Sequence, residues 1–134
     1  MGYMEELRAL VGHRRVILNG SVAVVRNGEG KILLQLRDDG RWGLPGGLME
    51  LGESCEETAR RETKEETGLD LGRLTLLGVW SGTLKAPDAE SLDFAWAELS
   101  ALPENLAASH RRILTERREA IEKGETPCDS YPGT

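Results

Sequence analysis

One stretch of this 134-residue chain constrains its fold more than any other, the segment Gly47–Leu69, GLMELGESCEETARRETKEETGL. It predicts a helix over residues 54–67. Ser54 is a favourable N-cap, and Glu57 three residues later completes a capping box. Gly68 is a typical helix terminator, because glycine adopts the left-handed conformation at little steric cost. The segment is therefore expected to be a glycine-led loop followed by a capped helix.

The predicted helix carries an acidic cluster, Glu62, Glu65 and Glu66. Residues spaced i, i+3 and i+4 lie on one face of a helix, and like charges four apart cost an isolated helix roughly 0.2–0.5 kcal/mol. A bound cation would remove this repulsion. Carboxylate oxygens are hard ligands, so Mg²⁺ is the expected metal and Mn²⁺ also fits. The cluster contains no histidine or cysteine that would favour zinc.

The opposite side of the same helix is expected to face the core. Cys55, Ala59 and Thr63 follow one another at intervals of four. A buried threonine can donate its hydroxyl back to its own helix. Cys55 has no base near it in the sequence, which favours a small core residue over a nucleophile.

Seven residues in this segment stand at fixed offsets and resemble the Nudix box, G-x5-E-x7-R-E-U-x-E-E-x-G-U, where U is a bulky aliphatic residue. Leu69 occupies the second aliphatic position, whereas Thr63 departs from the pattern at the first. The chain is thus similar to the Nudix hydrolase family. The matching residues are Gly47, Glu53, Arg61, Glu62, Glu65, Glu66 and Gly68.

The resemblance implies a metal-dependent hydrolase that cleaves a pyrophosphate bond in a nucleoside diphosphate linked to another moiety. The acidic cluster would be both catalytic and metal-binding, and the backbone carbonyl of Gly46 would join the metal shell. Arg61 and Glu53 would be catalytic-site residues that brace the loop against the helix. The general base would be Glu62 or Glu65 within the box, or Glu90 outside it.

Glu90 and Trp42 are the predicted substrate-binding residues. Glu90 precedes the strand-like run LDFAWAEL, and Trp42 lies in the glycine-rich approach to the box. Trp42, Trp80 and Trp96 can each stack on a base, but core packing is the alternative role for all three.

The expected fold class is α/β (α+β), a Nudix-type mixed β-sheet flanked by helices in a single domain over residues 1–134. Two apolar runs, 21–25 and 31–37, surround a turn and predict a hairpin. Further strands are expected over residues 73–80 and 91–99. A C-terminal helix should cover residues 107–123, ahead of a poorly ordered tail at 124–134.

The chain is short between Trp80 and Leu92, where the family resemblance implies further strand-forming sequence. Three explanations stay open. The chain can be a natural short form, it can carry an engineered deletion, or a second copy can supply the missing edge by strand exchange in a homodimer.

Charge and composition limit the classes of partner that the chain is expected to bind. The formal net charge of −6 argues against a general nucleic-acid or membrane-surface binder, which would be basic. A small phosphorylated ligand remains compatible, because a bound cation can reverse the local charge. Two cysteines, the lack of a long apolar run and an N-terminus unlike a signal peptide favour a cytoplasmic protein. The alternative function is a catalytically inactive nucleotide-binding module or a shortened inactive form.

Overall fold

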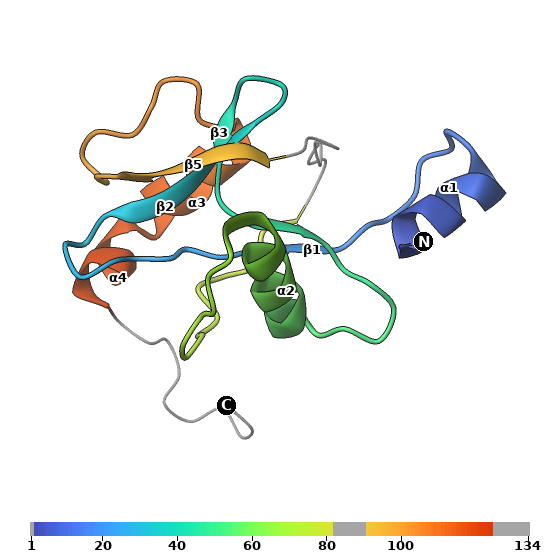
Figure 1. The fold of residues 1–134 in the computed structure, drawn as a ribbon, viewed down its shortest axis with the longest axis horizontal. Coiled ribbons are helices and arrows are strands. Elements are labelled where there is room, and N and C mark those ends of the chain that lie inside the picture. The colour runs from blue at the N-terminus through green and yellow to red at the C-terminus, as the bar shows by residue number, and fades with distance from the viewer. Residues whose placement is uncertain (1, 82–90, 125–134) are drawn as a thin grey trace. The chain divides into compact units, whose positions relative to one another are not determined.

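The computed structural model describes residues 2–81 and 91–124. These residues form helices and antiparallel strand pairs, which confirms the α+β class (Figure 1). The chain contains two compact units. One comprises residues 2–23 and 45–71, and the other comprises residues 24–44, 72–81 and 91–124. The expectation that the whole chain is a single domain stays a prediction.

The first unit contains a two-stranded sheet and two helices. Strands β1 (Gly20–Val22) and β4 (Gly46–Leu48) pair antiparallel, with Gly20 opposite Leu48 and Val22 opposite Gly46. Helix α2 (Cys55–Thr67) packs against both strands, and helix α1 (Tyr3–Val11) precedes them. The loop between β4 and α2 is the part of this unit that positions the site.

The second unit contains a three-stranded antiparallel sheet in the order β3-β2-β5. Its central strand β2 (Ile32–Arg37) is buried along nearly its whole length, because it pairs with a neighbour on each side. The core of this unit includes Ile32, Leu33, Leu34, Leu44, Leu114 and Ile121. The remaining elements are β3 (Trp42–Gly43), β5 (Ser91–Ala97), α3 (Ala108–Glu116) and α4 (Arg118–Lys123).

The predicted hairpin forms only beside its turn. The turn itself forms, with the Gly30 N–H donating to the Asn27 carbonyl at 3.0 Å. The two arms are joined by the antiparallel bridge Arg26–Ile32 and by the Leu33 N–H, which donates to the Val25 carbonyl at 2.9 Å. Farther from the turn, however, β1 pairs with β4 rather than with β2. The apolar pattern marks which residues are extended, but it does not specify which strand becomes the partner.

The strand predicted at residues 73–80 is also wrong, because residues 72–81 join no ladder within the described part of the chain. A β-strand exists only through pairing, so an apolar run without a partner stays irregular. The predicted C-terminal helix is divided at Arg117, where φ is −111° and ψ is 16°, outside the helical region. None of the described helices has the length and apolar character needed to cross a membrane.

A buried histidine connects α3 to the strand region of the second unit. The Leu44 N–H donates to Nδ1 of His110 at 2.9 Å, and His110 is 8% exposed. Burial, with a smaller contribution from the charge of Arg37, lowers the pKa of His110 from 6.5 to about 4. The native state therefore requires the neutral imidazole, because Nδ1 must keep a lone pair for the Leu44 N–H.

This requirement predicts an acid-sensitive fold. An unfolded histidine binds a proton below about pH 6.5, whereas His110 in the folded chain does so only near pH 4, so stability is lost as the pH falls through this window. The shift corresponds to at most about 3 kcal/mol. Urea unfolding of the wild type and of His110→Gln at pH 7 and pH 5 checks this. The variant should lose less stability between the two pH values, and equal losses would contradict the prediction.

Candidate active site

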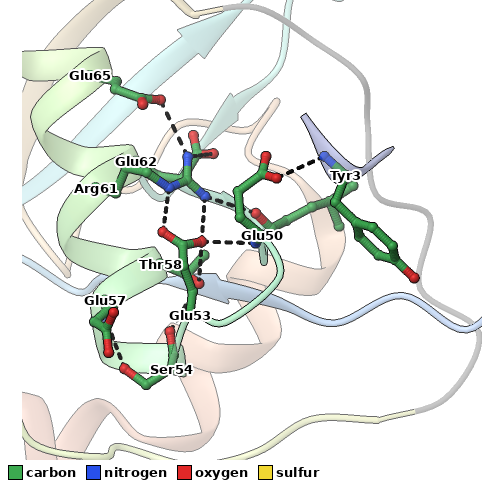
Figure 2. Close-up of polar contacts among 10 residues, drawn as sticks. Tyr3, Glu50, Glu53, Ser54, Glu57, Thr58, Arg61, Glu62 and Glu65 are labelled. Carbon is green, nitrogen blue, oxygen red and sulfur yellow. Dashed lines mark hydrogen bonds and ion pairs between the residues drawn. The ribbon is translucent and has the colours of Figure 1, made fainter. Parts of the chain in front are cut away.

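Helix α2 begins and ends as its sequence predicts. The Glu57 N–H donates to Oγ of Ser54 at 3.0 Å, which is the N-cap bond (Figure 2). Gly68 adopts the left-handed conformation with φ 77°, and its N–H donates to the Lys64 carbonyl at 2.9 Å. These two ends fix which residues of α2 face β4.

The buried face of α2 differs in two respects from the prediction. Ala59 and Thr63 are buried, but Cys55 is exposed and Thr58 occupies the core instead. Cys55 is the first helical residue, so it lies at the edge of the contact with the strands. The hydroxyl of Thr63 does not bond back to the helix, since its Oγ1 is buried with no hydrogen-bond partner among the described residues. Thr58 and Thr67 make that type of bond.

A bidentate ion pair joins α2 to the preceding loop. Arg61 donates from Nε to Oε2 of Glu53 at 2.6 Å and from a terminal nitrogen to Oε1 at 2.9 Å (Figure 2). Both side chains are largely buried, at 27% and 15% exposure. The bond from Arg61, assisted by the Glu50 N–H, lowers the pKa of Glu53 from 4.5 to about 2, and Glu53 in turn raises the pKa of Arg61. The pair therefore stays ionised at neutral pH.

Glu53 also fixes the loop itself. Its Oε1 accepts hydrogen bonds from the Glu50 N–H at 2.8 Å and from the Thr58 hydroxyl at 3.2 Å. The Glu50 carboxylate accepts the Tyr3 N–H at 2.7 Å, at the first turn of α1. Gly2, the N-cap of α1, offers no side-chain acceptor there. A residue distant in sequence thus satisfies one of the free N–H groups at the start of α1.

Arg61 contacts the acidic cluster as well. One of its terminal nitrogens lies 2.8 Å from a carboxylate oxygen of Glu62 and 3.4 Å from one of Glu65, and the other donates to the Leu48 carbonyl at 3.0 Å (Figure 2). Glu62 is 19% exposed and Glu65 is 60% exposed. One guanidinium therefore neutralises part of the negative charge that Glu53, Glu62 and Glu65 bring together.

Two of the three clustered carboxylates reach the strand β4. The Gly46 N–H donates to a carboxylate oxygen of Glu66 at 3.4 Å. A Cβ atom at Gly47 would lie only 2.5–2.8 Å from the carboxylate atoms of Glu62, so this carboxylate occupies the space where a side chain would be. Glu62 and Glu66 thus converge on the same two glycines, which places carboxylate oxygens beside the backbone of Gly46.

The donor set fits a magnesium ion. Within the described residues, no three side chains of the histidine, cysteine, aspartate or glutamate type gather closely enough to form a metal site by themselves. Mg²⁺ does not require such a cage, because it commonly binds one or two carboxylates and completes its shell with water and substrate phosphates. Glu62, Glu66 and the Gly46 carbonyl could supply these protein ligands. Glu65 lies on the same helix but is farther into solvent.

The predicted substrate-binding residues are not brought together by the described structure. Trp42 belongs to the second unit, where its backbone N–H donates to the Asn105 carbonyl and its backbone carbonyl accepts the Ala107 N–H. Glu90 lies outside the described residues. Both assignments stay predictions. Glu50 and Thr58 also contribute to the site but were not predicted from the sequence, because their roles depend on hydrogen bonds that no spacing pattern reveals.

Comparison with known proteins identifies the family. The NUDIX domain model matches residues 18–116 of this chain, which include β4, the loop after it and α2. The chain therefore belongs to the NUDIX family. The MutT NUDIX hydrolase from Burkholderia pseudomallei has a similar structure, with a TM-score of 0.61 and 31% identity over 73% of this chain and 95% of that one.

Two curated relatives are similar in sequence. An ADP-ribose pyrophosphatase from Methanocaldococcus jannaschii is 35% identical, covering 76% of this chain and 75% of that protein. The human 8-oxo-dGDP phosphatase NUDT18 is 37% identical over 67% of this chain. The matched segment spans only 36% of the human protein, and 43% of a further relative from Mycobacterium tuberculosis.

The unpartnered hydroxyl of Thr63 yields a stability prediction. Thr63→Val replaces the buried hydroxyl with a methyl group of similar size and removes an unmet hydrogen-bonding requirement, so the free energy of unfolding should rise by about 1 kcal/mol. Thr67→Val is the matched control, because the Thr67 hydroxyl donates to the Thr63 carbonyl at 2.7 Å, and this variant should be destabilised. Urea titration measures both, and a destabilised Thr63→Val would count against the assignment.

Proposed function

We propose that this chain hydrolyses a pyrophosphate bond in a nucleoside diphosphate linked to another moiety, in a reaction that depends on Mg²⁺. The observation that carries the proposal is the convergence of Glu62 and Glu66 on Gly46 and Gly47, with Arg61 beside them. Membership of the NUDIX family supports it. So do the names of the two curated relatives, a phosphatase of 8-oxo-dGDP and a pyrophosphatase of ADP-ribose.

The residues of α2 would have two roles, which are to bind the metal and to position its ligands. Glu62, Glu66 and the Gly46 carbonyl would hold the metal, which when bound neutralises the diphosphate and lowers the pKa of a coordinated water. Arg61 orients Glu62 through the 2.8 Å contact and is itself held by Glu53. Glu53 lies in the loop between β4 and α2. Its pair with Arg61 therefore fixes the helix that carries Glu62 and Glu66 relative to the strand that carries Gly46.

The general base would be one of the two carboxylates of the acidic cluster that Arg61 contacts, Glu62 or Glu65. Glu65 is the more accessible of the two, at 60% exposure against 19% for Glu62, and its contact with Arg61 is the longer one at 3.4 Å. A general base must reach a water molecule beside the diphosphate, which favours Glu65, the more exposed side chain. We therefore assign this role to Glu65, while Glu90 remains the candidate outside the helix.

The first test is Mg²⁺-dependent turnover of a panel that includes ADP-ribose and 8-oxo-dGDP, measured as nucleotide or phosphate release. Glu66→Gln should reduce turnover by about 100-fold or more, because the amide removes a negative ligand next to Gly46. Glu56→Gln is the matched control on the same helix, since Glu56 pairs with Arg60 on the surface. Activity retained by Glu66→Gln would refute the metal site, and an inactive wild type that binds Mg²⁺ would favour the binding-module alternative.

The close approach at Gly47 gives a second test. Gly47→Ala forces the Glu62 carboxylate to move, because the new methyl group would lie within 2.5–2.8 Å of it. Turnover should fall by about 10-fold or more, in line with small displacements of catalytic groups. Gly72→Ala is the control, as no atom lies within 4 Å of its added Cβ. Equal activities of the two variants in the nucleotide-release assay would contradict the assigned geometry.

A further inference from the structure

A pocket of about 270 Å³ lies in the first unit, between α1 and the loop that joins β4 to α2. It is separate from the glycine pair that receives Glu62 and Glu66. Its wall consists mostly of apolar side chains with a few polar groups, a composition typical of small-molecule sites. The lining residues that carry the argument are Tyr3, Ile17, Asn19, Glu50, Leu51 and Glu53.

The apolar rim of this pocket is unusually exposed. Ile17 is 94% exposed and Leu51 is 73% exposed, and both line the pocket. Removing apolar side chains from water is favourable, and a ligand with a flat apolar face would cover Ile17 and Leu51. The rim therefore favours an aromatic or planar group over a charged one.

The polar groups in the pocket select the ligand further. The lining contains two carboxylates and no lysine, arginine or histidine, so a phosphate group would be repelled there. Glu53 is saturated by Arg61, Thr58 and the Glu50 N–H. Oε1 of Glu50 accepts no hydrogen bond from the described residues, and Asn19, which also lines the pocket, has a side-chain amide that can donate and accept. These groups suit a ligand that carries N–H donors.

Two side chains, Glu53 and Arg61, connect the pocket to the acidic cluster. Glu53 lines the pocket and forms the bidentate pair with Arg61, which contacts Glu62 at 2.8 Å. Figure 2 shows Tyr3 and Glu50 on one side of this pair and Glu65 on the other. A ligand whose diphosphate meets Glu62 and Glu66 would have to pass around this ion pair for its other end to reach the pocket.

We propose that this pocket binds the nucleobase of the substrate, and that Glu50 and Asn19 favour bases with an exocyclic amino group. The inference deepens the proposed function, since it assumes that the substrate is a nucleoside diphosphate derivative. The planar base covers Ile17 and Leu51, and its amino group donates to Oε1 of Glu50. The proposal assigns base selection to the N-terminal helix and the loop rather than to the second unit.

The experiment measures nucleoside binding to the full chain without Mg²⁺, so that its result does not depend on hydrolysis. Adenosine and purine riboside, which lacks the 6-amino group, are titrated while the methyl signals of Met4 and Met49 in the pocket wall are followed by NMR. Adenosine should shift both signals and bind about 10-fold more tightly than purine riboside, the value expected for one hydrogen bond to a charged group.

Three variants complete the test. Ile17→Ser should weaken adenosine binding by about 5-fold or more, whereas Leu10→Ser should not, because Leu10 is 85% exposed on α1 and lies outside the pocket lining. Glu50→Gln keeps an oxygen for the Tyr3 N–H but should bring the two nucleosides to within about 2-fold of each other.

The outcomes separate this inference from the proposed function. Unmoved methionine signals, equal affinities of the two nucleosides for the wild type, or equal effects of Ile17→Ser and Leu10→Ser would each overturn the pocket assignment. Turnover of ADP-ribose or 8-oxo-dGDP by the same preparation would leave the proposed function intact in that case. Adenosine binding in the pocket without any turnover would support the pocket and reject the hydrolase.

Discussion

The ion pair between Arg61 and Glu53 is the interaction on which the candidate site depends. It is bidentate, largely removed from solvent and supported by the Glu50 N–H and the Thr58 hydroxyl. An arginine–glutamate pair exposed on the surface would contribute little to stability, because solvent screens the charges and the side chains lose conformational freedom. Here Glu50 in the loop and Thr58 in α2 supply further donors, so Glu53 satisfies several groups at once. The pair therefore links the loop, α2 and, through the Leu48 carbonyl, the end of β4.

The second constraint is the absence of side chains at Gly46 and Gly47. A Cβ atom at Gly46 would overlap the backbone of the paired strand β1, and one at Gly47 would overlap the Glu62 carboxylate. Strand pairing and the approach of α2 thus use the two faces of the same dipeptide. This explains in physical terms why both positions must be glycine for the carboxylates to reach the backbone.

The local features of the site could be predicted from sequence. The caps Ser54 and Gly68, the helix between them and the shared face of Glu62, Glu65 and Glu66 all follow from short-range rules, and the structure agrees with each of them. Predictions that required a partner were less successful. The run at residues 73–80 has strand-like composition but no pairing in the described chain, and β1 pairs with β4 instead of with the next strand. Cys55 and the Thr63 hydroxyl likewise depended on contacts that helical periodicity cannot specify.

The sequence by itself determined the family, the helix and the identity of the carboxylates, because these depend on spacings of a few residues along one helical turn or one loop. Only the tertiary structure decided that Glu62 and Glu66 meet Gly46 and Gly47, that Glu50 joins α1 to the loop, and that a pocket lies between them. These contacts join residues 15 to 47 positions apart. Their geometry depends on how the strands pair and how α2 packs, which short-range spacing leaves undetermined.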